Sequence, residues 1–355
     1  MRQSIRYLTT SDGVQLAWTA SGSGPALVRA ANWLTHLQYD LESPVWRHWV
    51  RFFDRHFSFI RYDERGCGMT QWRVEDVSMP RWCEDLEAVV DAAAPQGPLT
   101  LLGISQGAPT AIAYAVRNPG RVSKLILYGG LCTGWNHRAD PAGLRVFEAI
   151  IELVRDGWGS DNPHFRQFFV SRFVPDANPE QLEWLTELCR RTTSADVAVH
   201  LLRARADVDV RDLLPQVRVP TLVVHAARDE IVPIEQSRQL ASGIPGAEFV
   251  QVDSRNHIVL ETEPAWRQFK DVVLEFTGIG SKVAAADGRF AALSPREREV
   301  LAALASGRSN AEIGVGLHIS DKTVRNMLTR IFEKLGVRSR AQAMVVARDG
   351  GFTAA

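Results

Sequence analysis

Ser105 lies in the run Gly103-Ile104-Ser105-Gln106-Gly107, whose residue types and spacing suit a serine nucleophile. Four strand-favouring residues, 99–102, precede this run, and helix-compatible residues follow it up to Arg117. A strand, a sharp turn and a helix are the context in which a G-x-S-x-G sequence exposes its serine hydroxyl. The two glycines are expected because side chains at these positions would collide in so tight a turn. We therefore predict Ser105 as a nucleophile held in a strained backbone conformation.

A serine nucleophile needs a base beside it and an acid that orients the base. Asp229 and His257 each lie directly after an apolar, strand-like run. Serine, acid and histidine follow one another in this order in hydrolases whose serine lies on such a turn. The sequence predicts a catalytic triad of Ser105, Asp229 and His257. Glu230 and Asp253 stay open as alternative acids.

Strand-like and helix-like segments alternate around these residues. An N-terminal hairpin is predicted over 5–20, with its turn at Asp12-Gly13. Helix-like segments separate the later apolar runs, as in a parallel sheet that is covered on both faces. We predict an α/β fold with a doubly wound, mostly parallel sheet. The strands predicted after the hairpin are 26–28, 57–62, 99–102, 125–128, 220–226 and 248–252.

Residues of about 132–214 interrupt the alternation with helix-like segments rich in large apolar side chains. One interpretation is an extra helical layer with a core of its own. The other, which we favour, is a helical cap over the active site, because the segment interrupts the sheet at the end that carries Ser105. Some of its aromatic side chains would then line an apolar pocket. These aromatics are Trp135, Phe147, Trp158, Phe165, Phe168, Phe169, Phe173 and Trp184.

Residues up to about 280 resemble the α/β-hydrolase superfamily in the serine turn, the order of the triad and the stretch Tyr62-Asp63-x-Arg65-Gly66-x-Gly68-x-Thr70. This stretch is similar to a segment of the haloperoxidase-like and epoxide-hydrolase-like branches, and we expect a structural role for it. The resemblance implies that the backbone amides of Gln106 and Trp33 form an oxyanion hole. The loop Ala30-Ala31-Asn32-Trp33 lacks the His-Gly pair that is frequent there, so slow turnover is expected. His36 is either a pocket residue or a surface residue.

The C-terminal part of the chain carries several helix starts in close succession. Ser294, Ser309 and Ser320 each stand where a helix N-cap is expected. The second and third of these helices are predicted over Asn310–Leu317 and Asp321–Leu335. Two short helices joined by a few residues are typical of a helix-turn-helix, whose second helix enters the DNA major groove.

Residues 293–343 closely resemble the LuxR-type DNA-binding domain, also called NarL/FixJ-type, in the runs L-S-P-R-E-R-E-V-L, S-N-A-E-I, I-S-D-K-T-V-R-N and K-L-G-V-R-S-R-A-Q-A. Val324, Ile331 and Leu335 have the spacing of one buried helix face. Met327 departs from the family, which frequently has histidine at this position. The fourth helix, 339–348, is similar to the family's dimerisation element, so we expect a homodimer.

The exposed face of the predicted recognition helix carries side chains suited to DNA. Arginine pairs bidentately with guanine and asparagine with adenine, while lysine and further arginines suit phosphates. The resemblance implies that Arg325, Asn326 and Thr329 face base edges. Phosphate contacts are expected for Lys322, Arg330 and Lys334. The predicted set of residues that bind double-stranded DNA is Lys322, Thr323, Arg325, Asn326, Thr329 and Arg330.

The charge is distributed unequally along the 355 residues, although the formal net charge is zero. From Gly288 onward the chain carries 11 Lys and Arg against 6 Asp and Glu, whereas residues 1–287 carry 30 against 35. Only the basic C-terminal part therefore suits a polyanion. We predict a hydrolase-like domain over 1–278, a linker over 279–290 and a DNA-binding domain over 291–355.

The sequence predicts no cofactor, no metal and no membrane contact. The four cysteines lack a CxxC spacing, so each is expected as a free buried thiol. No apolar run approaches the ~20 residues of a membrane span, and the first residues do not lead into the apolar region of a signal peptide. We expect a cytoplasmic protein.

Three functions fit these observations. The first, which we favour, is a transcriptional regulator whose hydrolase-fold domain binds, and in one version hydrolyses, a small ester, lactone or other apolar molecule as its signal. The second is a serine esterase or lactonase with a DNA-binding tail for autoregulation or localisation. The third is a catalytically idle scaffold that recruits a protein partner to promoters. An idle pocket has no need of Ser105, Asp229 and His257 together, so the third is disfavoured.

Overall fold

The computed structural model describes residues 3–93, 95, 97–138, 140–279, 290, 292–317, 319–349 and 352. The chain divides into two compact units, Met1–Val273 and Leu274–Ala355. The predicted linker, 279–290, lies outside the described residues except for its two end residues, so the predicted domain boundaries stay predictions. None of the described helices is both long and apolar enough to cross a membrane. The four cysteines are free and buried, as predicted.

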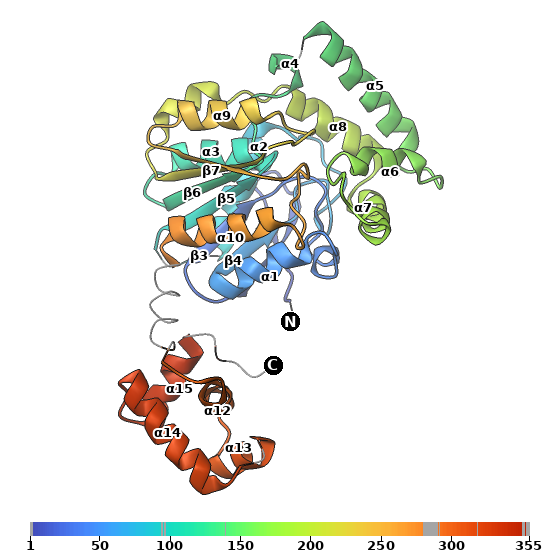
Figure 1. Cartoon of the computed structure of the whole chain (residues 1–355). Helices are drawn as coiled ribbons and strands as arrows, with labels where there is room; N and C mark the ends of the chain where they lie inside the picture. Colours follow the sequence, from blue (N-terminus) through green and yellow to red (C-terminus); the bar gives the residue numbers. More distant parts are fainter. Residues whose placement is uncertain are drawn as a thin grey trace. The chain divides into compact units, whose positions relative to one another are not determined.

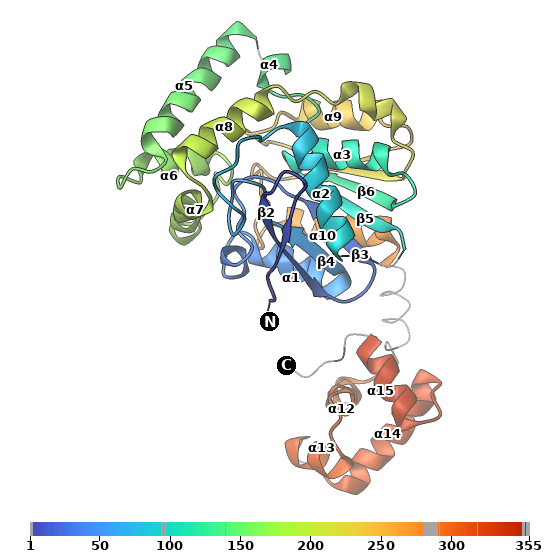
Figure 2. The same cartoon turned by 180° about the vertical axis from the view of Figure 1, so that it is seen from behind.

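The first unit is built on an eight-stranded sheet in the order β1-β2-β4-β3-β5-β6-β7-β8 (Figure 1, Figure 2). β1 pairs antiparallel with β2, and β2 pairs antiparallel with β4. The remaining neighbours pair parallel, which confirms the predicted α/β class with a mostly parallel sheet. The strands are β1 (Arg6–Thr9), β2 (Gln15–Gly22), β3 (Ala26–Ala30), β4 (Ser58–Tyr62), β5 (Leu99–Ile104), β6 (Val122–Tyr128), β7 (Thr221–Ala226) and β8 (Glu248–Val252).

β5 lies in the middle of the sheet and leads into the serine turn. All six of its residues are buried. Leu101 of β5 is in register with Val28 of β3 and with Leu125 of β6. A strand of this kind is typical of a parallel sheet that is covered on both faces. The carboxyl ends of β5, β7 and β8 lie at one edge of the sheet, so the loops that follow these strands can meet.

Helices cover both faces of the sheet (Figure 1). On one face α1 (Arg47–His56), which follows the short 3₁₀ helix η1 (Tyr39–Leu41), packs against α10 (Pro264–Thr277). The ring centroids of Trp49 and Phe269 lie 4.6 Å apart at this contact. The other face carries α2 (Met79–Ala93), α3 (Gly107–Arg117) and α9 (Ile234–Gly243).

A helical insertion lies between β6 and β7, at one end of the sheet (Figure 1). Phe147, Ile151 and Ala206 form a small buried cluster of its own between α5 and α8. Asp140 caps α5 by accepting a hydrogen bond from the amide of Gly143. The elements are α4 (Trp135–Arg138), α5 (Pro141–Gly157), α6 (His164–Ser171), α7 (Pro179–Thr192), α8 (Ala195–Ala206) and the 3₁₀ helix η2 (Arg211–Gln216).

The second unit contains α12 (Pro295–Ala305), α13 (Asn310–Leu317), α14 (Asp321–Leu335) and α15 (Arg340–Asp349). α13 and α14 have the bounds predicted from the sequence. Ser320 caps α14, and Gly336 ends it in the left-handed conformation with φ 65°. Val324, Ile331 and Leu335 are buried, as their spacing predicted. α14 therefore packs one face into the core of this unit and leaves the other exposed.

Candidate functional site

Ser105 lies at the sharp turn between β5 and α3 with a backbone φ of 51°, a conformation that residues with a side chain rarely adopt. Glycines flank it because the backbone is crowded on both sides. A Cβ on Gly103 would stand 2.7 Å from Cα of Ala108. A Cβ on Gly107 would stand 2.8 Å from the carbonyl oxygen of Ala30. The strain and the close approach are those expected of a nucleophile turn.

Asp229 and His257 are brought together although 28 positions separate them in the sequence. Nδ1 of His257 lies 2.5 Å from Oδ2 of Asp229. Oδ1 accepts hydrogen bonds from the backbone amides of Ile231 at 2.8 Å and Val232 at 3.1 Å, so both carboxylate oxygens are held. Burial alone would raise the pKa of Asp229, but His257 beside it lowers that pKa below its usual value. An ionised carboxylate only accepts hydrogen bonds, so Nδ1 of His257 carries a proton and Nε2 is available as a base.

The two acids that the sequence left open lie elsewhere. Glu230 faces the guanidinium of Arg255 at 3.4 Å, and Asp253 pairs with Arg228 at 2.6 Å on the surface. Within the described part of the chain, Asp229 is the carboxylate that pairs with His257. The geometry therefore favours Asp229 as the acid of the predicted triad.

The predicted oxyanion donors, Trp33 and Gln106, line one cavity together with Ser105 and His257. Among the described residues neither backbone amide has a hydrogen-bond acceptor, so both are free to bind a ligand oxygen. Leu34, the residue after Trp33, has a φ of 61°. Two residues that line this cavity, Leu34 and Ser105, therefore have a strained backbone, a feature that clusters at functional sites.

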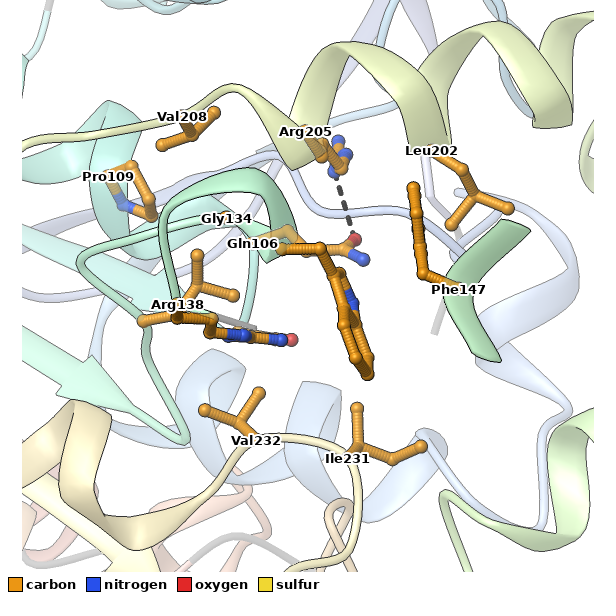
Figure 3. A pocket seen from close by; sticks show the side chains of 13 residues that line it. Gln106, Pro109, Gly134, Arg138, Phe147, Leu202, Arg205, Val208, Ile231 and Val232 are labelled. Atoms are coloured by element: carbon orange, nitrogen blue, oxygen red, sulfur yellow. Dashed lines mark hydrogen bonds between the residues drawn. The ribbon is translucent and has the colours of Figure 1, made fainter. Parts of the chain in front are cut away.

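Two cavities meet at Ser105, and both are lined by Ser105 and Gln106. Their empty volumes, which include the open mouths, are about 450 and 540 Å³. The smaller one, here called the apolar cavity, lies between Trp33, Trp46, Val170, Phe173, Leu185 and His257. The larger one, here called the arginine cavity, lies between Trp135, Arg138, Phe147, Leu202, Arg205 and Ile231 (Figure 3).

The helical insertion contributes walls to both cavities. Phe173 reaches the apolar cavity, and Trp135 and Phe147 reach the arginine cavity. The insertion is thus a cap over Ser105 and also a layer with its own core, so both interpretations of the sequence hold. Not every predicted aromatic lines a cavity: Trp158 is buried and stacks on Trp33 at 5.1 Å, while Phe168 is 57% exposed.

Two arginines of the arginine cavity escaped the sequence analysis. Arg205, near the end of α8, donates a hydrogen bond of 2.9 Å to Oε1 of Gln106 and pairs with the buried carboxylate of Glu64. Arg138, at the end of α4, places its guanidinium 5.1 Å from the ring centroid of Trp135. Figure 3 shows both side chains at the cavity. They belong to no motif and lie far from Ser105 in the sequence, so no local signal could have identified them.

The stretch around Asp63 and Arg65 has the structural role expected of it. Arg65 is fully buried between Asp85 at 2.6 Å and Asp12 at 2.8 Å. His36 is half-buried, accepts a hydrogen bond from the amide of Tyr39 and lines neither of the two cavities. The pocket role considered for His36 is therefore not found. Among the described residues, no cluster of three His, Cys, Asp or Glu side chains could hold a metal ion.

The side chains predicted to bind DNA lie on the exposed face of α14. Arg325 forms an ion pair of 2.8 Å with Asp321 on the same face. Lys334, for which a phosphate contact is expected, pairs at 2.6 Å with Glu297 of α12 and so joins two helices. Met327 packs against the core of the unit, which accounts for an apolar residue there. The exposed residues are Lys322, Thr323, Arg325, Asn326, Thr329 and Arg330.

The comparison with known protein families agrees with this geometry. The α/β-hydrolase family described as serine aminopeptidase, S33, matches residues 47–260, which is more than half of the chain. The chain belongs to this family. Its relatives include the AB hydrolase superfamily protein YisY of Bacillus subtilis, which is 28% identical over 261 residues that cover 71% of this chain and 91% of that protein.

Solved structures share the hydrolase fold. A hydrolase from Pseudomonas aeruginosa superposes with a TM-score of 0.64 and 24% identity, covering 78% of this chain and 98% of that one. An enol-lactonase from Burkholderia xenovorans superposes with a TM-score of 0.63 and 20% identity, covering 77% of this chain and 100% of that one. At this identity the similarity establishes the fold alone.

Residues 291–347 match a second family, described as bacterial regulatory proteins, luxR family. The probable HTH-type transcriptional regulator GfsR of Streptomyces halstedii is 54% identical over 65 residues, which are 18% of this chain and 27% of that protein. The S33-family domain is thus joined to a LuxR-type DNA-binding domain. Both resemblances found in the sequence are confirmed.

Proposed function

We propose that this chain is a transcriptional regulator whose hydrolase-fold domain binds a small ester, lactone or other apolar molecule as its signal. The observation that carries the proposal is the pair of cavities at Ser105 in a chain that also has a LuxR-type domain. Concave, mostly apolar sites with a few polar groups suit small molecules. A ligand that binds one state of the chain better than another shifts DNA affinity by that difference in free energy.

The arrangement around Ser105 also supports hydrolysis of the ligand. In the proposed reaction Nε2 of His257 takes the proton of Ser105 as its oxygen attacks the carbonyl carbon. The amides of Gln106 and Trp33 stabilise the oxyanion, and Asp229 stabilises the imidazolium. His257 then gives the proton to the leaving alkoxide, and water releases the acyl group by the same route.

We further propose that the chain binds double-stranded DNA through α14 and does so as a homodimer. The six predicted DNA-binding side chains of α14 are all exposed and support the DNA contact, because they combine base-reading and phosphate-binding types. Val345 on α15 is 57% exposed, which supports a dimer contact on the helix expected for it. Sedimentation equilibrium of the full chain with and without DNA tests the dimer, and a monomer bound to its selected site would contradict it.

A second candidate function is a serine esterase or lactonase whose DNA-binding tail serves autoregulation. The contact between Asp229 and His257 favours it, because a site that only binds needs no oriented base. The two candidates share the ligand site and differ in whether turnover is the signal.

Both candidates are tested on the full chain with 4-nitrophenyl esters of increasing acyl length. We expect hydrolysis that is lost in Ser105→Ala and kept in Ser242→Ala, a matched change of an exposed serine on α9. Fluorescence anisotropy with DNA selected from a random library gives the DNA affinity in the presence of each ester. If the ester still changes the DNA affinity of Ser105→Ala, binding of the ester is the signal. If the change is lost in this variant, hydrolysis is the signal. Hydrolysis of the esters without any change of DNA affinity would contradict the proposed regulator function and support the esterase function.

A further inference from the structure

The arginine cavity carries a positive charge that its own walls do not balance. Arg138 and Arg205 line it, and its described lining includes no Asp or Glu. The charge of Arg205 is compensated by an ion pair with Glu64, which does not line the cavity. Arg138 has no ion pair with any described carboxylate; it donates to the carbonyl oxygen of Thr133 at 3.2 Å. One guanidinium in this cavity therefore has a hydrogen-bonding capacity that the protein leaves largely unused.

The surroundings of Arg138 make this free charge costly unless a ligand compensates it. The side chain is half-buried and lies beside Trp135, and Figure 3 shows it near Ile231 and Val232. Burial lowers the pKa of Arg138 from its ordinary value, yet a guanidinium stays protonated at neutral pH. Arg138 also borders an open groove that is lined by Asp140, Glu230 and Glu235. None of these three carboxylates forms an ion pair with it.

The orientation of Arg138 suits a planar anion. Its guanidinium is positioned over the ring of Trp135, at 5.1 Å from the centroid, and one nitrogen is engaged by Thr133. A guanidinium that lies over an aromatic ring and has one nitrogen engaged still has further N–H donors along the edges of its own plane. A carboxylate accepts two parallel hydrogen bonds from such an edge, and this pairing is strong away from water.

We propose that the arginine cavity binds the acidic end of the ligand, so that the signal molecule is an ester or lactone that also carries a carboxylate. Arg138 is the residue that binds this carboxylate. The inference rests on the proposed ligand site at Ser105 and names its substrate class. Since Ser105 lines both cavities, the reacting carbonyl lies between the acidic end at Arg138 and an apolar end near Phe173.

Isothermal titration calorimetry on the full chain tests the inference with 4-phenylbutyrate and its neutral isostere 4-phenylbutanamide. We expect the acid to bind at least tenfold more tightly than the amide. Arg138→Met should lower the affinity for the acid to that for the amide and leave the affinity for the amide unchanged. Arg138→Lys should keep part of the preference for the acid. Arg145→Met, which removes an exposed arginine of the neighbouring α5, should behave as the unsubstituted chain.

The outcomes separate this inference from the proposal on which it rests. Equal affinity for acid and amide in the unsubstituted chain, or a preference that survives Arg138→Met, would overturn the acidic-ligand inference and leave the ligand site intact. A chain that binds neither probe contradicts the inference and the ligand site together. Unchanged amide binding by Arg138→Met shows that the variant has kept its cavity, so a loss of acid binding alone supports the inference.

Discussion

Nη1 of Arg205 donates a hydrogen bond of 2.9 Å to Oε1 of Gln106, and this bond joins cap helix α8 to the residue after Ser105. The same guanidinium pairs with Glu64 on the loop after β4. Arg205 therefore links the cap, the serine turn and the loop after β4 to one another. Displacement of the cap at this point would also disturb Gln106, whose backbone amide is a proposed oxyanion donor.

Arg205→Met should destabilise the hydrolase domain by about 3–5 kcal/mol, because it leaves the carboxylate of Glu64 buried without its partner. Burial raises the pKa of Glu64 even with Arg205 beside it, so the unpaired acid would take up a proton. Arg203→Met is the matched control: its ion pair with Glu148 is exposed and should contribute at most about 1 kcal/mol. Urea unfolding followed by fluorescence measures both. Equal losses would contradict the role of Arg205, and the double change with Glu64→Gln should recover stability.

Asp229→Asn should lower kcat for a 4-nitrophenyl ester by roughly 10³–10⁴-fold, because an amide no longer holds His257 in the reactive tautomer. Asp253→Asn is the control, since that carboxylate is exposed and pairs with Arg228. Steady-state kinetics on both variants test the assignment of the acid. A loss in Asp253→Asn comparable to that in Asp229→Asn would contradict it.

Gly103→Ala should cost about 1–3 kcal/mol of unfolding free energy, because the new Cβ would stand 2.7 Å from backbone of α3 and force β5 and α3 apart. Gly120→Ala has no atom within 4 Å of the added Cβ and should change stability by less than about 0.5 kcal/mol. Thermal and urea unfolding compare the two. Similar stabilities of the two variants would show that the serine turn has more room for a side chain than its geometry indicates.

His48 should make the hydrolase domain sensitive to acid. Burial lowers the pKa of His48 to about 4, against about 6.5 for an exposed imidazole. As the pH falls below 6.5 the unfolded chain takes up the proton first, so stability present above pH 6.5 is lost progressively towards pH 4, up to about 3 kcal/mol. In His48→Phe this loss should disappear, since the carbonyl oxygen of Val259 still accepts from Nε1 of Trp49 at 3.1 Å.

The difference in unfolding free energy between the unsubstituted chain and His48→Phe isolates this effect, because the other titrating groups are common to both. Urea titrations at several pH values between 4 and 7.5 measure that difference. A difference that stays constant over this range would contradict the buried neutral state of His48.

Arg325→Ala should weaken binding to the selected DNA site by ~1–3 kcal/mol and change binding to unrelated DNA much less, because a base contact is lost. Lys322→Ala should instead weaken binding to both DNAs. It should also reduce the slope of log K against log salt concentration by about one, as expected for a phosphate contact. Anisotropy titrations over a range of salt concentrations distinguish these patterns. An equal effect of Arg325→Ala on both DNAs would contradict base reading.

Local chemistry explains which features could be predicted from the sequence. The start of α14 follows from the capping side chain of Ser320, and the serine turn follows from two glycines and a strand. The cavity arginines Arg138 and Arg205 could not be predicted, because the cavity that they line is built from segments distant in the sequence. The same reason applies to the ion pair of Lys334, whose partner Glu297 belongs to another helix. The catalytic and DNA-binding roles of the predicted residues stay predictions.

The crowding at Gly103 and Gly107 has a consequence for how this molecule can diversify. The place of the Ser105 oxygen is set by main-chain contacts within β5 and α3, whereas much of the surface that meets a ligand comes from the insertion between β6 and β7. Substitutions in the insertion can thus alter which compound is recognised while the reactive atom keeps its place. In the proposed function, reactivity and selectivity would therefore lie on separate segments, and a related chain could change its ligand without any change in the serine turn.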